Sequence, residues 1–88
     1  MKTYIIGYDL VTPGQDYKKL FEAIKSYPGY YHMLDSTWLV QSSKTASEIC
    51  NHLMQYIDRN DKLFVGGWTG EGAWYGLEEE GSKWLKAA

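Results

Sequence analysis

Asp9 is the residue of this sequence best placed to do chemistry. It directly follows the hydrophobic run Tyr4–Tyr8 and precedes the chain break Thr12–Gly14, so its carboxylate is expected at the end of a strand. Carboxylate oxygens are the ligands that Mg²⁺ or Mn²⁺ prefers, and such an ion could activate water for phosphodiester cleavage. Because one carboxylate is a poor metal site, a catalytic or metal-binding role requires Asp9 residues from two twofold-related chains. Otherwise Asp9 is expected to hydrogen bond to its own loop or to the following helix.

Large aromatic side chains are the second candidate group, and they make up 16% of the chain. The set of interest is Trp38, Trp68, Trp74, Tyr75 and Trp84. Such side chains either fill a core or dimer interface, or form a pocket on which bases stack. A pocket for a small ligand needs little positive charge, which suits this chain. The glycine-rich stretch 66–72 could offer backbone amides to an anion or simply form a twisted turn into an edge strand.

The remaining reactive side chains have no partners at useful spacing. His32 and His52 lack a second ligand at metal-binding distance along the sequence. His32 is a candidate general base only if it lies near a dimer axis. The single cysteine, Cys50, excludes an internal disulfide and is expected to pack as a small apolar residue.

Length and charge limit the partners. The chain has 88 residues and a net charge of −2, which predicts one domain with a thin core. No basic stripe is present, so extended duplex DNA is an unfavoured partner. No apolar run is long enough for a signal peptide or a membrane span, so a cytoplasmic protein is expected.

Apolar periodicity predicts the elements that position these residues. The helical period runs from Tyr17 to Tyr27, with either Thr12 or Asp16 as the cap that starts this helix. It appears again after a capping box formed by Thr45 and Glu48. Asp35 and Ser36 separate two extended runs and predict a tight hairpin, although one slightly bent continuous strand would have the same pattern. The expected strands are 4–9, 30–34, 37–42 and 62–68, with a short fifth strand over 73–77. The last ten residues are expected to form a short amphipathic helix or an extended tail.

The order β-α-β-β-α-β predicts an α+β fold of the ferredoxin-like type, with two helices on one sheet face. One domain is expected, with a core over 2–68 and a C-terminal extension over 69–88. The other sheet face is left bare by this plan. A second copy of the chain, or the C-terminal extension, is expected to cover it.

Three segments carry a resemblance to a known family: Tyr8-Asp9, Leu34–Trp38 and the charged turn Asp58–Asp61. Over residues 2–68 the chain resembles the small ferredoxin-fold subunit of the CRISPR spacer-acquisition complex and its relatives, including the virulence-associated D ribonuclease toxins. The resemblance implies a homodimer with face-to-face sheets and Asp9 near the twofold axis. It also implies divalent metal and, in some members, phosphodiester cleavage. Ser36 matches the hairpin serine of the family.

The chain departs from that family in charge and in its tail. Its first helix carries lysines where those subunits usually have arginines, and the chain is acidic overall. We therefore expect a small, non-enzymatic homodimeric binding module for a nucleotide, a short nucleic acid or a protein partner. The alternative is a metal-dependent nuclease that uses paired Asp9 carboxylates. The predicted ligand-binding residues are Tyr8, Ser36, Trp38, Trp68, Trp74 and Tyr75.

Overall fold

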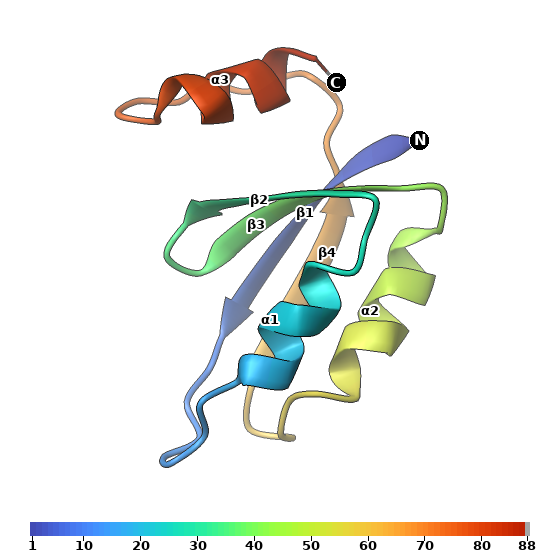
Figure 1. The fold of residues 1–88 in the computed structure, drawn as a ribbon, viewed down its shortest axis with the longest axis vertical. Helices are drawn as coiled ribbons and strands as arrows, with labels where there is room; N and C mark the ends of the chain where they lie inside the picture. The colour runs from blue at the N-terminus through green and yellow to red at the C-terminus, as the bar shows by residue number, and fades with distance from the viewer. Residues whose placement is uncertain (88) are drawn as a thin grey trace.

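The computed structural model describes residues 1–87 and has an α+β fold (Figure 1). Four strands and three helices occur within these residues. In chain order they are β1 (Lys2–Asp9), α1 (Lys18–Ile24), β2 (Gly29–Leu34), β3 (Thr37–Ser42), α2 (Ala46–Met54), β4 (Lys62–Gly67) and α3 (Glu79–Lys86). The expected β-α-β-β-α-β order is therefore present. Residue 88, the last of the expected extension, lies outside the described residues.

The strands form one sheet in the order β2-β3-β1-β4, and each neighbouring pair is antiparallel. β1 and β3 are the central strands, while β2 and β4 are the edges. The predicted hairpin is confirmed: Asp35 and Ser36 form the turn between β2 and β3. The β2–β3 register shifts between His32 and Leu34, which marks a bulge at Met33.

The first sheet face carries the main core and is covered by α1 and α2 (Figure 1). Tyr4, Ile6 and Tyr8 alternate along β1 toward this face, as a strand half buried against helices requires. The helices and the residues that flank α1 contribute buried apolar side chains to the same cluster: Tyr17, Leu20, Ala23, Ile24, Tyr27, Ile49 and Leu53. Cys50 is only half buried, so it is less enclosed than expected.

Polar side chains accept backbone N–H groups at the starts of α1 and α2. The predicted capping box of α2 is confirmed, since Thr45 and Glu48 each accept the other's backbone N–H. α1 begins after Tyr17, which has a left-handed conformation with φ of 55°. The Oδ1 atom of Asp16 accepts the Lys18 N–H at 3.1 Å, so the later of the two predicted starts is the observed one. α1 ends at Ile24, one turn earlier than the periodicity suggested.

The second sheet face is partly covered by the C-terminal segment, residues 68–87. The Trp84 ring stacks on Tyr31 of β2, and a Cβ on Gly81 would lie 3.2 Å from the Tyr31 ring. The final residues form helix α3, as expected. The predicted fifth strand over 73–77 is wrong: this stretch has no strand pairing and includes Gly76 with φ of 79°. Its glycines give it the conformations of a loop that bends over the sheet.

None of the helices within residues 1–87 is both long and apolar enough to cross a membrane.

Candidate functional site

An apolar pocket lies between the C-terminal segment and the second sheet face. We call it the tail pocket, and its volume is about 280 Å³. Its lining residues are Ile5, Met33, Leu34, Trp68, Gly72, Ala73, Trp74, Tyr75, Leu77 and Leu85. Three of the six predicted ligand-binding residues, Trp68, Trp74 and Tyr75, therefore come together here.

Hydrogen bonds from the tryptophans hold the wall of the tail pocket in place. The backbone N–H of Trp68 donates to the Thr3 carbonyl at 2.9 Å. This bond continues the pairing with β1 beyond the end of β4. The Trp68 indole N–H donates to the Leu85 carbonyl at 2.9 Å and ties the start of the segment to α3. The Trp74 indole donates to the Ser82 hydroxyl at 3.0 Å. A buried or anchored indole with a satisfied N–H presents a fixed apolar surface.

Glycine is required at one point of this wall. A Cβ at Gly72 would lie 2.3 Å from the Trp68 ring, a distance that real side chains do not reach. The loop can cross over Trp68 only because residue 72 has no side chain. Next to it, Trp74 is 36% exposed and Tyr75 is fully exposed. The mouth of the pocket therefore has aromatic surface that the chain itself leaves uncovered.

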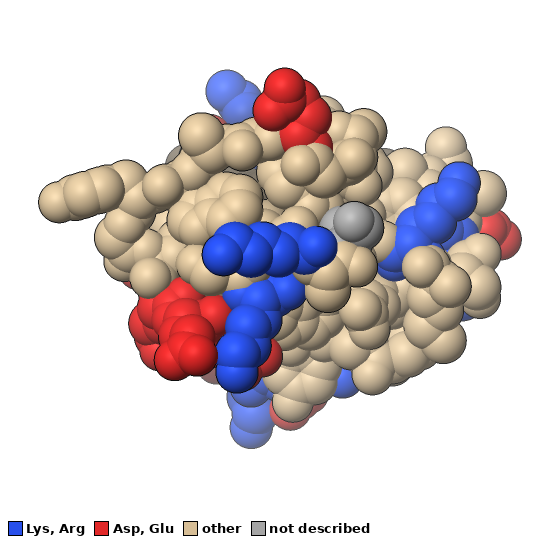
Figure 2. All heavy atoms as spheres, turned by 90° about the horizontal axis from the view of Figure 1, so that it is seen from above, with Lys and Arg blue, Asp and Glu red and all other residues tan. Residues whose placement is uncertain are grey.

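The tail pocket is uncharged inside, and acidic residues stand next to its lining residues in the sequence. None of its lining residues carries a charge. Glu71, Asp35 and the run Glu78–Glu80 are exposed and directly adjoin lining residues in the sequence. Figure 2 looks onto the α3 end of the molecule and shows acidic side chains gathered where α3 begins. Lys83 lies 3.7 Å from Glu79 and offsets part of this charge.

Asp9 lies apart from the tail pocket, on the uncovered part of the second face. It is exposed, it ends β1, and it stands opposite Lys62 of β4. Both residues border a shallow hollow of about 230 Å³ that also includes Gly7 and Phe64. Within residues 1–87 no three His, Cys, Asp or Glu side chains come together as metal ligands. A metal held by Asp9 would need a ligand from a second chain.

The other predicted site residues support the hairpin instead. Trp38 and Tyr8 are buried on the first sheet face, where the Trp38 indole N–H donates to the Tyr8 hydroxyl at 2.9 Å. Burial raises the pKa of Tyr8, the Trp38 bond lowers it, and the Asp35 carboxylate raises it further, with a net rise. The Ser36 carbonyl accepts the Tyr8 N–H at 3.1 Å. These residues do not join the tail pocket.

The two histidines lie against aromatic rings. His32 stacks on Trp38 with centroids 4.1 Å apart and an 8° angle between the rings, and its Nε2 bonds to the Asp35 carbonyl at 3.1 Å. His52 Nδ1 and the Tyr27 hydroxyl are hydrogen bonded at 2.7 Å. Both histidines are therefore held by contacts within the fold.

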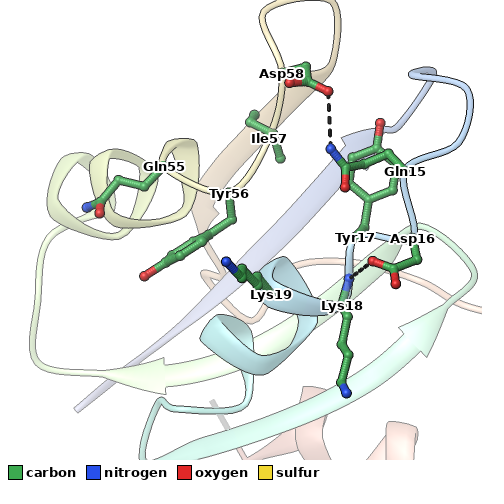
Figure 3. Close-up of a pocket in the computed structure, with 9 residues that line it drawn as sticks. All are labelled: Gln15, Asp16, Tyr17, Lys18, Lys19, Gln55, Tyr56, Ile57 and Asp58. Carbon is green, nitrogen blue, oxygen red and sulfur yellow. Dashed lines mark hydrogen bonds between the residues drawn. The ribbon is translucent and has the colours of Figure 1, made fainter.

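A second cleft, which sequence reasoning missed, lies between the start of α1 and the loop after α2 (Figure 3). Its volume is about 410 Å³, and the side chains of Gln15 and Asp58 are bonded across it at 3.4 Å. Lys18 and Lys19 line it together with Asp16 and Asp58, so its positive and negative charges balance. No spacing in the sequence indicates this cleft, because its walls come from segments some forty residues apart.

No protein-family model matches this sequence, and no solved structure matches the chain.

Proposed function

We propose that this chain is a protein-binding module whose tail pocket accepts an apolar side chain from a partner. The observation that carries the proposal is an uncharged pocket of about 280 Å³ beside two exposed aromatic residues, Trp74 and Tyr75. Apolar pockets that are rimmed by aromatic side chains are typical anchor sites at protein interfaces. The module acts by binding and is not an enzyme.

Charge favours a protein over a nucleotide or a short nucleic acid. Phosphate groups are bound by Lys, Arg or converging backbone N–H groups. The tail pocket has no basic lining residue, and Glu71 and the run Glu78–Glu80 adjoin lining residues in the sequence. Negative charge on these neighbouring residues disfavours a phosphate and favours a basic segment.

The fold proposal rests on the strand order and the position of the helices. We assign the core to the ferredoxin-like type, since the order β2-β3-β1-β4 with α1 and α2 on one face fits that plan. The resemblance to the spacer-acquisition subunits and their relatives suggests that the module is a homodimer. Exposed Leu34 and Phe64 on the second face support self-association.

Probe titration tests the pocket. We expect Nile red, a neutral apolar dye, to bind with a blue-shifted emission, and adenosine monophosphate and a short RNA not to compete. Leu77→Asp, which places a charge in the wall, should abolish dye binding. Met54→Ala, an exposed residue on α2, is the matched control and should bind as the native chain does. Saturable binding of the nucleotide or the RNA, with no dye binding, would overturn the proposal.

One observation favours a second candidate function, a metal-dependent nuclease. Asp9 is exposed at the open part of the second face, where another chain could bring a second Asp9. In that case the paired carboxylates would hold Mg²⁺ or Mn²⁺ and activate water. RNA and DNA cleavage assays with these ions compare the native chain with Asp9→Asn. Cleavage that survives the substitution rules out Asp9 as the catalytic group.

A further inference from the structure

The edge strand β2 lacks the charges and prolines that usually guard an edge against a further strand. It lies at one end of the strand order and pairs only with β3, so its outer N–H and C=O groups face no other strand within residues 1–87. Natural proteins guard such edges with charged side chains, above all Lys, with Pro or with a covering element. β2 reads Gly-Tyr-Tyr-His-Met-Leu and has neither a charged residue nor a proline. Its outer edge can therefore pair with an added strand.

The opposite edge strand, β4, is less suited to such pairing. It begins at exposed Lys62 and ends in Gly66 and Gly67. Lysine on an edge strand discourages the approach of another strand, and glycine weakens a strand because it has no side chain to pack. Of the two edges of this sheet, β2 is therefore the better place for a partner.

A bulge near the end of β2 turns two consecutive side chains toward the tail pocket. Successive residues of a regular strand point to opposite faces, yet Met33 and Leu34 both line this pocket. The register shift between His32 and Leu34 accounts for this, because a bulge adds one residue and re-aims the side chain that follows. The outer edge of β2 therefore leads directly to a wall of the pocket.

A strand added to β2 would bring its side chains to the tail pocket. Neighbouring strands lie about 4.8 Å apart, and alternate residues of the added strand would point to the second face. On that face they would meet Leu34, which is 51% exposed, and the exposed rings of Trp74 and Tyr75 that line the same pocket. On the first face they would meet Tyr30, which is 47% exposed. The edge therefore has uncovered apolar surface on both sides.

The charges near this end of β2 favour a basic partner. Asp35 is exposed and directly follows the strand. The exposed run Glu78–Glu80 directly follows the lining residue Leu77, and acidic side chains gather where α3 begins (Figure 2). Lys83 lies near Glu79, and the other acids of this group have no ion pair within residues 1–87. A segment that carries Lys or Arg would supply the missing positive charge.

We propose that the partner of the tail pocket is an extended basic segment of another protein, which pairs with the outer edge of β2 and places one large apolar side chain in the pocket. In this mode of recognition the backbone hydrogen bonds provide affinity, and a pocket for one side chain provides specificity. The inference rests on the proposed function, because it names the kind of partner that the tail pocket accepts.

Selection from a library of short displayed peptides tests the chemistry of the partner. We expect the native chain to select peptides that alternate Lys or Arg with apolar residues around one large apolar residue. They should bind Met54→Ala as they bind the native chain, and bind Leu34→Asp at least about tenfold more weakly, because this change puts a charge in the pocket wall. Circular dichroism checks that both variants are folded. Selection of acidic peptides, or of none, overturns the proposal.

Methylation of the peptide backbone separates strand pairing from side-chain binding. A selected peptide is made with N-methyl groups on alternate residues, in two versions that block its two edges in turn. Only the edge that faces β2 needs free N–H groups, so one version should lose binding and the other should keep it. Replacing the large apolar residue with alanine should weaken binding by about tenfold or more. Equal binding by the two methylated versions overturns strand addition, whatever the folding of the protein variants.

Hydrogen exchange locates the added strand. The bound peptide should slow exchange of the outward-facing amides of β2 and leave the amides of β4 unchanged, because only β2 gains a neighbour. Slower exchange in β4 and not in β2 contradicts the assignment of the edge. If the amides of β2 become protected without peptide as the concentration of the chain rises, a second copy is the occupant, and the proposal of a basic partner is overturned.

Dye displacement separates failure of this inference from failure of the proposed function. A selected peptide should displace Nile red from the native chain, because its apolar side chain occupies the same pocket. Dye binding by a chain that selects no peptide, or whose peptides leave the dye in place, keeps the pocket proposal and overturns the strand partner. Absence of both dye binding and peptide binding overturns both proposals.

Discussion

The carboxylate of Asp61 joins two loops that lie fifty residues apart in the sequence. Its Oδ1 accepts the Tyr17 hydroxyl at 2.8 Å, the Val11 N–H at 2.9 Å and the Thr12 hydroxyl at 3.3 Å. Its Oδ2 accepts the Asp58 N–H at 2.9 Å. This one side chain therefore fixes the loop before α1 against the turn before β4, and holds Tyr17 in its left-handed conformation.

The charge of Asp61 makes the stability of the fold depend on pH. Burial raises the pKa of this carboxyl, but its four hydrogen bonds outweigh burial and lower the pKa overall. Because the pKa of Asp61 is lower in the folded state than in the unfolded state, its charge stabilises the fold at a pH above the pKa of the unfolded state. This contribution is lost as the pH falls through the pKa of the folded state. We expect Asp61→Asn to be less stable at pH 7 and to lose less stability than the native chain between pH 5 and pH 2. Urea unfolding at each pH measures this, with exposed Glu22→Gln as the control.

Removing the hydroxyl of Tyr17 separates the hydrogen bond from the ring. Tyr17→Phe keeps the buried ring but removes the donor to Asp61 and the acceptor of the Thr12 N–H. Hydrogen bonds to charged groups contribute about 1.5–3 kcal/mol. We expect the free energy of unfolding to fall by about that amount at pH 7. A loss below about 0.5 kcal/mol would show that the network does not hold the loop.

At the scale of elements, α2 has the best-defined start. Thr45 Oγ1 accepts the Glu48 N–H at 3.2 Å, and Glu48 Oε1 accepts the Thr45 N–H at 2.8 Å. Thr45→Ala removes one half of this box and should lower the free energy of unfolding by about 1 kcal/mol. Thr45→Ser keeps the acceptor oxygen and should stay close to the native value. Thermal unfolding of both variants checks the pair, and equal losses would exclude capping as the cause.

The elements were predictable where a local pattern decides them. Apolar periodicity and the capping box indicated α2, and Asp35-Ser36 indicated the hairpin. The start of α1 was only bracketed, because Tyr17 takes its conformation from Asp61, a partner far along the chain. The fifth strand failed because Ala73–Leu77 has the aromatic content of a strand but no neighbouring strand to pair with.

The candidate site was predictable only in part. Trp68, Trp74 and Tyr75 could be predicted to share a site because they lie within one short stretch of the sequence. The aromatic content also placed Trp38 in this group, but side chains alternate between the two faces of a strand, and Trp38 lies on the opposite sheet face. Ile5 and Leu34 also line the pocket, and their positions there depend on how the strands pair. A register between distant strands cannot be counted along the chain.

At the scale of the whole molecule, the two sheet faces differ in how firmly they are covered. The first face packs against α1 and α2 in a continuous apolar cluster (Figure 1). The second is covered by α3 at the end of a loop that includes Gly70, Gly72 and Gly76. Leu85 and the Trp84–Tyr31 stack are the main apolar contacts of α3. A short helix with few buried contacts opens locally at a lower free energy than the whole domain.

Hydrogen exchange measures that difference. We expect amides of α3 to exchange on the order of a hundredfold faster than those of β1 and β3, through an opening that leaves the first face intact. Trp84→Ala should speed exchange in α3 further and leave the exchange of Ile6 and Val40, in the main core, unchanged. Exchange of α3 at the rate of β1 would instead mean that both sheet faces unfold as one unit.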